Sequence, residues 1–136
     1  MKLLSVRGRY VFKNCDRYRI DWDKKERSNF QTDVKRFLRP YLKNHVVYSE
    51  FPVFGSKMTI DIFDATDRVA YEVQGRQHEE YVEFLSRNRV GYLNQMRRDG
   101  RKVKWCEANE IKLVQIFERD LPLTREFFWN KFEVFL

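Results

Sequence analysis

Two short apolar segments joined by four polar residues constrain the fold of this chain more than any other feature. Residues 58–64 and 69–74 have the length and the β-branched and aromatic content of strands. The four residues between them, 65–68, are enough only for a turn. We therefore expect an antiparallel hairpin at the centre of the chain.

The hairpin brings carboxylates together. If it is symmetric about Thr66 and Asp67, Asp61 lies opposite Glu72, with Gln74 beside Glu72 on the same face. Like charges directly opposed, with Cβ atoms ~4.5–5.5 Å apart, destabilise a strand pair. A bound cation would remove the repulsion, and hard oxygen ligands suit Mg²⁺ or Mn²⁺. The alternatives are a solvated outer face of the sheet, or an Asp that pairs with a nearby Arg.

A helix and a third strand should precede the hairpin. Ser28 is a suitable N-cap, and apolar residues from Phe30 to Leu42 recur on one helical face. Pro40 is expected to end or kink this helix. Residues 46–51 then have the composition of a strand.

The chain after the hairpin predicts a helix, a strand and a last helix. Apolar spacing favours a long helix over residues 90–108, with Asn109 as its left-handed cap. A right-handed crossover would place a strand at residues 111–117 parallel to residues 69–74. Thr124 should cap a helix whose aromatic face carries Phe127, Phe128, Phe132, Phe135 and Leu136. The predicted fold class is α/β (α+β): one domain, residues 1–136, with a central mixed sheet flanked by helices.

Two further titratable residues stand in unusual places. Asp99 falls on the inward stripe of the long helix, where a charge must be paired or lie at the edge of a site. His78 follows the Glu72 strand closely and could shuttle a proton or bind a phosphate. A histidine in such a loop can also be incidental.

Net charge and composition limit the kinds of molecule that this chain is expected to bind. The chain has 27 Lys and Arg against 20 Asp and Glu, a net charge of +7, which favours a polyanion such as nucleic acid. Ordinary solubility charge is the alternative. Residues 1–27 are basic and aromatic, and form either an arm that contacts nucleic acid or an edge strand. Without an apolar run of ~18–20 residues we expect no membrane span and a cytoplasmic location. Two Cys and two His outside ligand spacing make structural zinc a poor expectation.

The motif Ile60-Asp61, then Tyr71-Glu72-Val73-Gln74-Gly75, then His78 resembles the PD-(D/E)XK nuclease superfamily and its restriction-endonuclease-like core. The stretch from Arg98-Asp99 and Lys102 to Val114 looks like the helix and strand of small phage-encoded members. The very-short-patch-repair and homing endonucleases are also similar. The resemblance covers residues 28–117, between the N-terminal arm and the C-terminal helix at 122–136.

The resemblance implies a metal site and an acid–base site. Asp61, Glu72 and the Val73 carbonyl would bind Mg²⁺ or Mn²⁺, with Glu50 as a further candidate ligand. Gln31 is near the place where many members carry an acidic residue on the first helix. Gln74 stands where the family usually has Lys, and it would orient water while the metal and His78 activate it. Asp99 joins this catalytic set.

The expected function is a metal-dependent DNA endonuclease, phage-encoded. The alternatives are a weak or inactive nucleic-acid-binding module of the same fold, and a protein-interaction subunit or homodimer that uses the C-terminal helix. Basic residues expected on the DNA backbone, each of which could instead belong to a plain solvated face, are Arg7, Arg9, Arg76, Arg97, Arg98, Arg101, Lys102 and Lys104.

Overall fold

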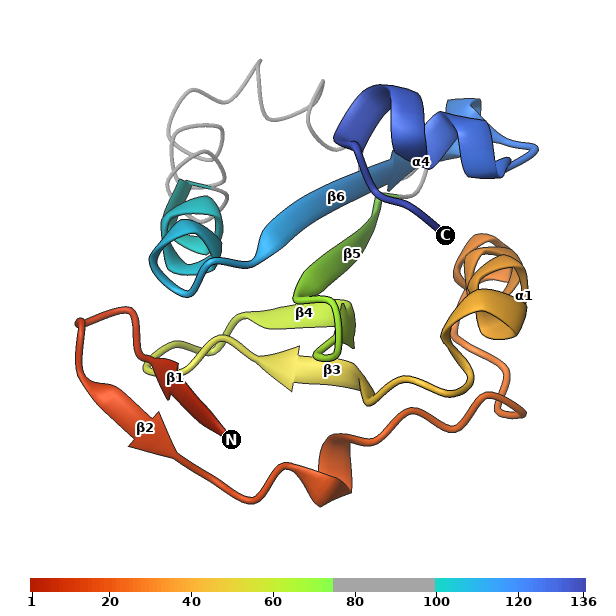
Figure 1. Ribbon diagram of the computed structural model, residues 1–136. Coiled ribbons are helices and arrows are strands. Elements are labelled where there is room, and N and C mark those ends of the chain that lie inside the picture. The colour runs from red at the N-terminus through yellow and green to blue at the C-terminus, as the bar shows by residue number, and fades with distance from the viewer. Residues whose placement is uncertain (75–99) are drawn as a thin grey trace, which may run out of the picture.

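A mixed four-stranded sheet lies at the centre of the protein, in the order β3-β4-β5-β6 (Figure 1). The computed structural model describes residues 1–74 and 100–136. The strands β3 (Val47–Pro52), β4 (Thr59–Asp64) and β5 (Val69–Gln74) are antiparallel neighbours, and β6 (Lys112–Phe117) runs parallel to β5. The mixed α+β fold and the parallel last strand predicted from the sequence are confirmed.

The register of the β4–β5 hairpin is the predicted one. Ile62 pairs with Tyr71, and Asp64 with Val69. The turn between the strands is held by Asp64, whose Oδ1 accepts the Thr66 N–H at 3.0 Å. A local hydrogen bond in the turn therefore stabilises the hairpin, in addition to the apolar residues of its strands.

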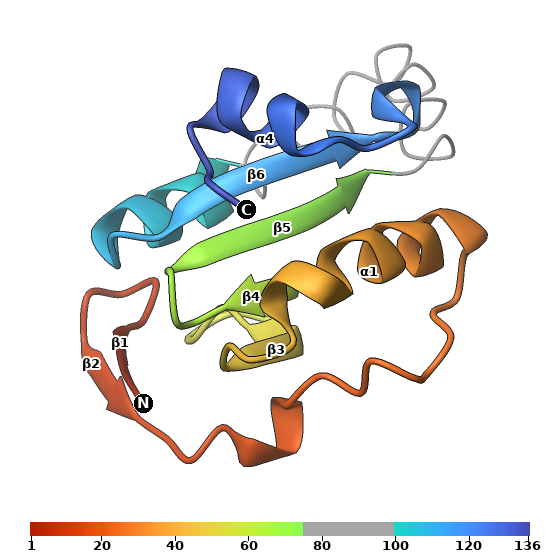
Figure 2. The ribbon, with the colours of Figure 1, turned by 45° about the vertical axis from the view of Figure 1, so that its right-hand side comes forward.

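Helices cover both faces of the sheet (Figure 2). On one face α1 (Asn29–Leu42) and α4 (Arg125–Phe132) pack on Tyr71 and Ile116. On the other face the helical residues 100–108 contribute Trp105 and Cys106 to a cluster with Phe63. Within residues 1–74 and 100–136, no helix is both long and apolar enough to cross a membrane.

Both predicted N-caps are confirmed. The Ser28 hydroxyl accepts the Gln31 N–H at 3.0 Å, and the Thr124 hydroxyl accepts the Phe127 N–H at 3.1 Å. Of the two effects expected of Pro40, the end of the helix is wrong, since α1 continues to Leu42 with Pro40 inside it; a kink stays a prediction. Its apolar face, which is buried as far as Leu42, holds these last residues on the sheet.

The last helix is shorter than its aromatic pattern suggested. It ends at Phe132 because Glu133 adopts the left-handed conformation, with φ of 55°. Phe135 and Leu136 therefore lie beyond the helix, and the Phe135 side chain is exposed.

The helical residues 100–108 end in a Schellman motif. The Ile111 N–H donates to the Cys106 carbonyl at 2.8 Å, and the Glu110 N–H donates to the Glu107 carbonyl at 3.1 Å. The left-handed residue is Glu110, with φ of 56°. The prediction of Asn109 at this position is wrong by one residue.

Asn109 instead connects the N-terminus to the core. Its buried side chain accepts the Leu4 N–H at 2.7 Å and donates to the carbonyls of Leu4 and Trp105. Leu4 ends β1 (Lys2–Leu4), which forms a two-stranded antiparallel sheet with β2 (Tyr10–Phe12). The predicted N-terminal arm is thus a hairpin attached to the helix, and the short 3-10 helices η1 (Asp16–Tyr18) and η2 (Glu118–Asp120) lie in connecting segments.

Candidate active site

The β3–β4 pair is irregular at the position of Glu50 and Asp61. Ser49 pairs with Ile62 and Phe51 pairs with Ile60, but no backbone pairing joins the residues between them. Glu50 is in the left-handed region, with φ of 49°. Such a conformation is costly for a side chain other than glycine, and residues of this kind concentrate at functional sites.

The alternation of side chains changes at the same position. Tyr48 and Phe51 contribute to one core cluster although they are three residues apart, and so do Ile60 and Phe63. In a regular strand, residues three apart point to opposite faces. The alternation of side chains between the two faces is therefore offset by one residue in both strands, although the pairing register is the same on either side, and Asp61 has no backbone partner in β3.

The side chain of Asp61 contacts β5. The β4–β5 pairing ends at Ile62–Tyr71, and at the next position Asp61 Oδ2 accepts the Val73 N–H at 2.8 Å. The carboxyl groups of Asp61 and Glu72 lie close enough for each to shift the pKa of the other. The sequence correctly predicted that Asp61 and Glu72 lie close together. They do so through side-chain contacts, because the backbone ladder of β4 and β5 does not continue to them.

Burial dominates the ionisation of this pair. Glu72 is 5% exposed, and burial together with the neighbouring Asp61 charge raises its pKa to about 8. Burial also raises the pKa of Asp61, while the Val73 N–H, the neighbouring Glu72 and Lys102 oppose that rise. With a pKa of about 8, Glu72 keeps its proton at neutral pH, as one of two closely spaced carboxyl groups does.

Lys102 is the cation beside the pair. Its Nζ lies 3.2 Å from Glu72 Oε1, and it comes from the helical residues 100–108 that cover this face of the sheet. Lys102 therefore lies beside the carboxyl pair, and its expected contact with the DNA backbone stays a prediction. Arg101 and Lys104, on the same helical segment, are exposed.

A basic cavity of about 720 Å³ adjoins Asp61. Glu50 and Gln31, the two residues suggested by the family resemblance, both line it. Most of the lining comes from the segment that precedes α1. The basic residues in the lining are Arg17, Arg19, Lys24, Lys25, Arg27 and Lys35. Sequence reasoning noted a basic N-terminal region but could not place it beside Asp61, since no local pattern reports this long-range contact.

The remaining predicted residues fall in three places. Val73 and Gln74 end β5 and are half-buried, with Gln74 on the same face as Glu72 because the β5–β6 register is unbroken. Arg7 and Arg9 are exposed near the β1–β2 turn and do not line the cavity. Residues that lie outside the described part of the chain are Arg76, His78, Arg97, Arg98 and Asp99.

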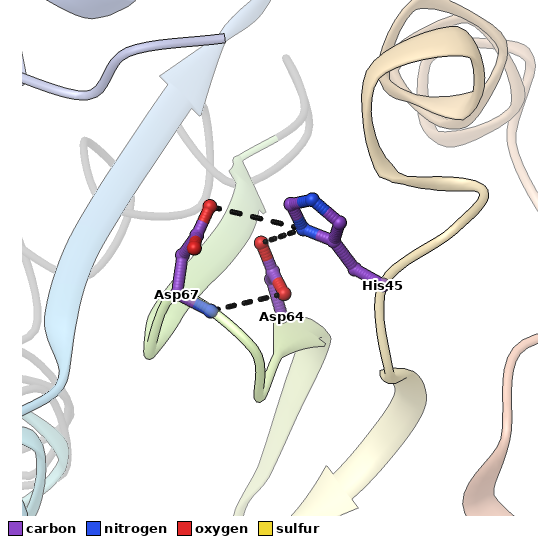
Figure 3. Close-up of side chains that lie close together, drawn as sticks. All are labelled: His45, Asp64 and Asp67. Atoms are coloured by element: carbon purple, nitrogen blue, oxygen red, sulfur yellow. Dashed lines mark hydrogen bonds and ion pairs between the residues drawn. The ribbon is translucent and has the colours of Figure 1, made fainter.

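A second group of possible metal ligands lies at the β4–β5 turn (Figure 3). His45 Nδ1 is 3.0 Å from Asp64 Oδ2 and 3.7 Å from Asp67 Oδ2. Sequence reasoning missed this group, although two Asp three residues apart in the hairpin turn were a signal for it. The turn hydrogen bonds to Asp64 and its contact with His45 account for the group without an ion.

The carboxyl pair fits a divalent cation better. Asp61 and Glu72 offer the hard oxygen donors that Mg²⁺ and Mn²⁺ prefer, and Glu50 lines the same cavity as Asp61. The raised pKa values indicate that a positive charge at this place would be favourable. The Val73 carbonyl as a ligand stays a prediction.

Comparison with known proteins gives a narrow result. No family model matches the chain, and no solved structure matches it. The chain is similar to a viral protein, the Uncharacterized protein 033L of Invertebrate iridescent virus 3, at 29% identity over 94 residues. The match covers 65% of this chain and 48% of the relative, so the chain matches about half the length of that protein. The relative's name states no activity.

Proposed function

We propose that this chain is a metal-dependent DNA endonuclease of the PD-(D/E)XK type. The observation that supports this most is the pair formed by the buried Glu72 and the half-buried Asp61, and Asp61 also lines a cavity with six basic residues. Ionisation of both carboxyl groups is unfavourable at this place, and a bound cation would remove that cost. A phosphodiester and a divalent cation together match this combination of acidic and basic groups.

The chain's own residues would hold the reacting groups in place. The Val73 N–H orients Asp61, and Lys102 supplies beside Glu72 the positive charge that Gln74 lacks. The basic residues of the cavity would hold the phosphates that flank the cleaved bond. A cation held by Asp61 and Glu72 would lower the pKa of a bound water and offset the charge that develops on the phosphate.

The test is cleavage of plasmid and oligonucleotide DNA with Mg²⁺, Mn²⁺ or EDTA. We expect Asp61→Asn and Glu72→Gln to lower the cleavage rate at least about 100-fold, because a catalytic metal contributes several kcal/mol to transition-state stabilisation. Asp33→Asn, an exposed carboxylate on α1, serves as the control with the same change of charge. Circular dichroism and thermal unfolding check that the variants fold. Identical products from wild type and Asp61→Asn would show the proposal to be wrong.

A second candidate is a nucleic-acid-binding module without turnover. It is favoured by Lys102 and by the proton of Glu72, which already offset the charge of the carboxyl pair without a metal. In that case DNA binding would be insensitive to EDTA, and no cleavage would appear with either metal.

A further inference from the structure

Four cations in the cavity have no acidic partner among the described residues. Arg19, Lys24, Lys25 and Arg27 line the cavity and are exposed, and no ion pair joins them to a carboxylate within residues 1–74 and 100–136. Lys35 differs from them because it is buried and paired with Glu26. Exposed and unpaired cations on one wall are available for an anionic ligand.

The wall that carries these cations is held in place. Lys35 Nζ donates to the Lys24 carbonyl at 2.7 Å and to Glu26 Oε1 at 3.0 Å, and the Glu26 N–H donates to the Thr32 hydroxyl at 3.1 Å. These bonds attach residues 24–26 to α1. At the other end Arg19 forms a backbone bridge with Tyr48 of β3. The segment thus presents its cations from a backbone fixed on both sides, which lowers the entropic cost of binding.

The volume of the cavity favours a single DNA strand over a duplex as the ligand. Its volume of about 720 Å³ lies in the range of sites for small ligands, roughly 300–1,000 Å³. A duplex carries its phosphates on the outside of a wide cylinder and meets proteins along open surfaces. A single strand is narrow enough to enter, and proteins bind it with a basic groove and an aromatic side chain, here Tyr18 in the same lining.

We propose that the cavity binds the phosphates of a single DNA strand and directs that strand to Asp61. This inference rests on the proposed nuclease function and names its substrate class. The segment that carries the four cations precedes residue 28, so it lies outside the part of the chain that resembles the nuclease superfamily.

The experiment measures binding of a fluorescent single strand and of its duplex by anisotropy, in EDTA so that no cleavage occurs, over a series of salt concentrations. Lys24→Ala/Lys25→Ala removes two cavity cations, and Arg36→Ala/Lys43→Ala removes two exposed cations outside the cavity. We expect wild type to prefer the single strand. The cavity variant should bind it about tenfold more weakly, with a salt slope smaller by about 1.4, or ~0.7 for each lost phosphate contact. The control should change little.

Two results would overturn the inference: equal or tighter binding of the duplex by wild type, or equal losses in the cavity and control variants. Failure of the nuclease proposal is separate. Single-strand binding that depends on Lys24 and Lys25, without cleavage in Mg²⁺ or Mn²⁺, would refute the nuclease and support the cavity. Cleavage that depends on Asp61, with a KM unchanged in Lys24→Ala/Lys25→Ala, would refute the cavity alone.

Discussion

At the scale of single residues, Glu72 has the most unusual environment of the candidate site. It lies between Asp61, which opposes its ionisation, and Lys102, which favours it. The Cys106 thiol, whose pKa burial raises to about 12, is also near it and stays neutral. The proton of Glu72 is therefore bound tightly by the folded protein and weakly by the unfolded chain, where a glutamate has a pKa near its ordinary 4.5.

This difference predicts how stability depends on pH. Since the folded-state pKa is raised, the protonated Glu72 stabilises the fold below about pH 4.5, and that contribution is lost as pH rises towards about 8. Between these values the free energy of unfolding should fall by up to about 1.4 kcal/mol for each pH unit. Urea unfolding at several pH values measures the slope. Glu72→Gln should remove it, and Glu107→Gln, an exposed glutamate, should not. A slope that persists in Glu72→Gln would assign the titration to another group.

At the scale of elements, the buried amide of Asn109 joins the N-terminal hairpin to the helix that carries Lys102. Its side chain makes three hydrogen bonds, two to Leu4 and one to Trp105. Asn109→Ala leaves the Leu4 N–H without its partner, and we expect unfolding to require about 2 kcal/mol less. Urea unfolding measures the loss. Asn130→Ala, at an exposed position on α4, should change stability by less than about 0.5 kcal/mol. Equal effects in both variants would contradict the role assigned to Asn109.

The elements that sequence predicted well are those set by local signals. Ser28 and Thr124 are caps whose side chains act within three residues, and the β4–β5 register follows from the polar turn at Thr66. The parallel position of β6 follows from chain connectivity. The prediction of Asn109 as the left-handed residue of the Schellman motif was wrong because the Asn109 side chain bonds Leu4 across the molecule. No local sequence pattern indicates that contact.

Only part of the candidate site could be predicted from the sequence, for the same reason. Asp61 and Glu72 could be predicted because each is next to a member of the Ile62–Tyr71 pair that ends the hairpin ladder. Three other features could not be predicted, because they depend on how a helix and a neighbouring strand pack on the hairpin. They are the left-handed Glu50, the offset in side-chain alternation, and the contact of Lys102 with Glu72. The cavity depends on residues far from Asp61 in the sequence, such as Lys24.

At the scale of the whole molecule, the two candidate metal positions lie at different places on the same hairpin. Asp61 is in β4, at the interruption of pairing with β3, whereas Asp64 ends that strand at the turn beside His45. Both positions offer oxygen ligands. They differ in surroundings, because Asp61 lines a basic cavity and lies beside Glu72, whereas Asp64 already bonds the turn and His45.

A metal that binds only the folded chain must stabilise all of it, which separates these positions. At a concentration 100 times its Kd, Mg²⁺ or Mn²⁺ should add about 2.7 kcal/mol and raise Tm by on the order of 10 °C. At one fixed metal concentration the rise should be larger at pH 8 than at pH 6, since the ion displaces the Glu72 proton, and EDTA should reverse it. Differential scanning calorimetry measures the shift. Asp61→Asn should abolish it and His45→Gln should preserve it, and the reverse result would move the metal to the turn, away from the cavity and from the proposed chemistry.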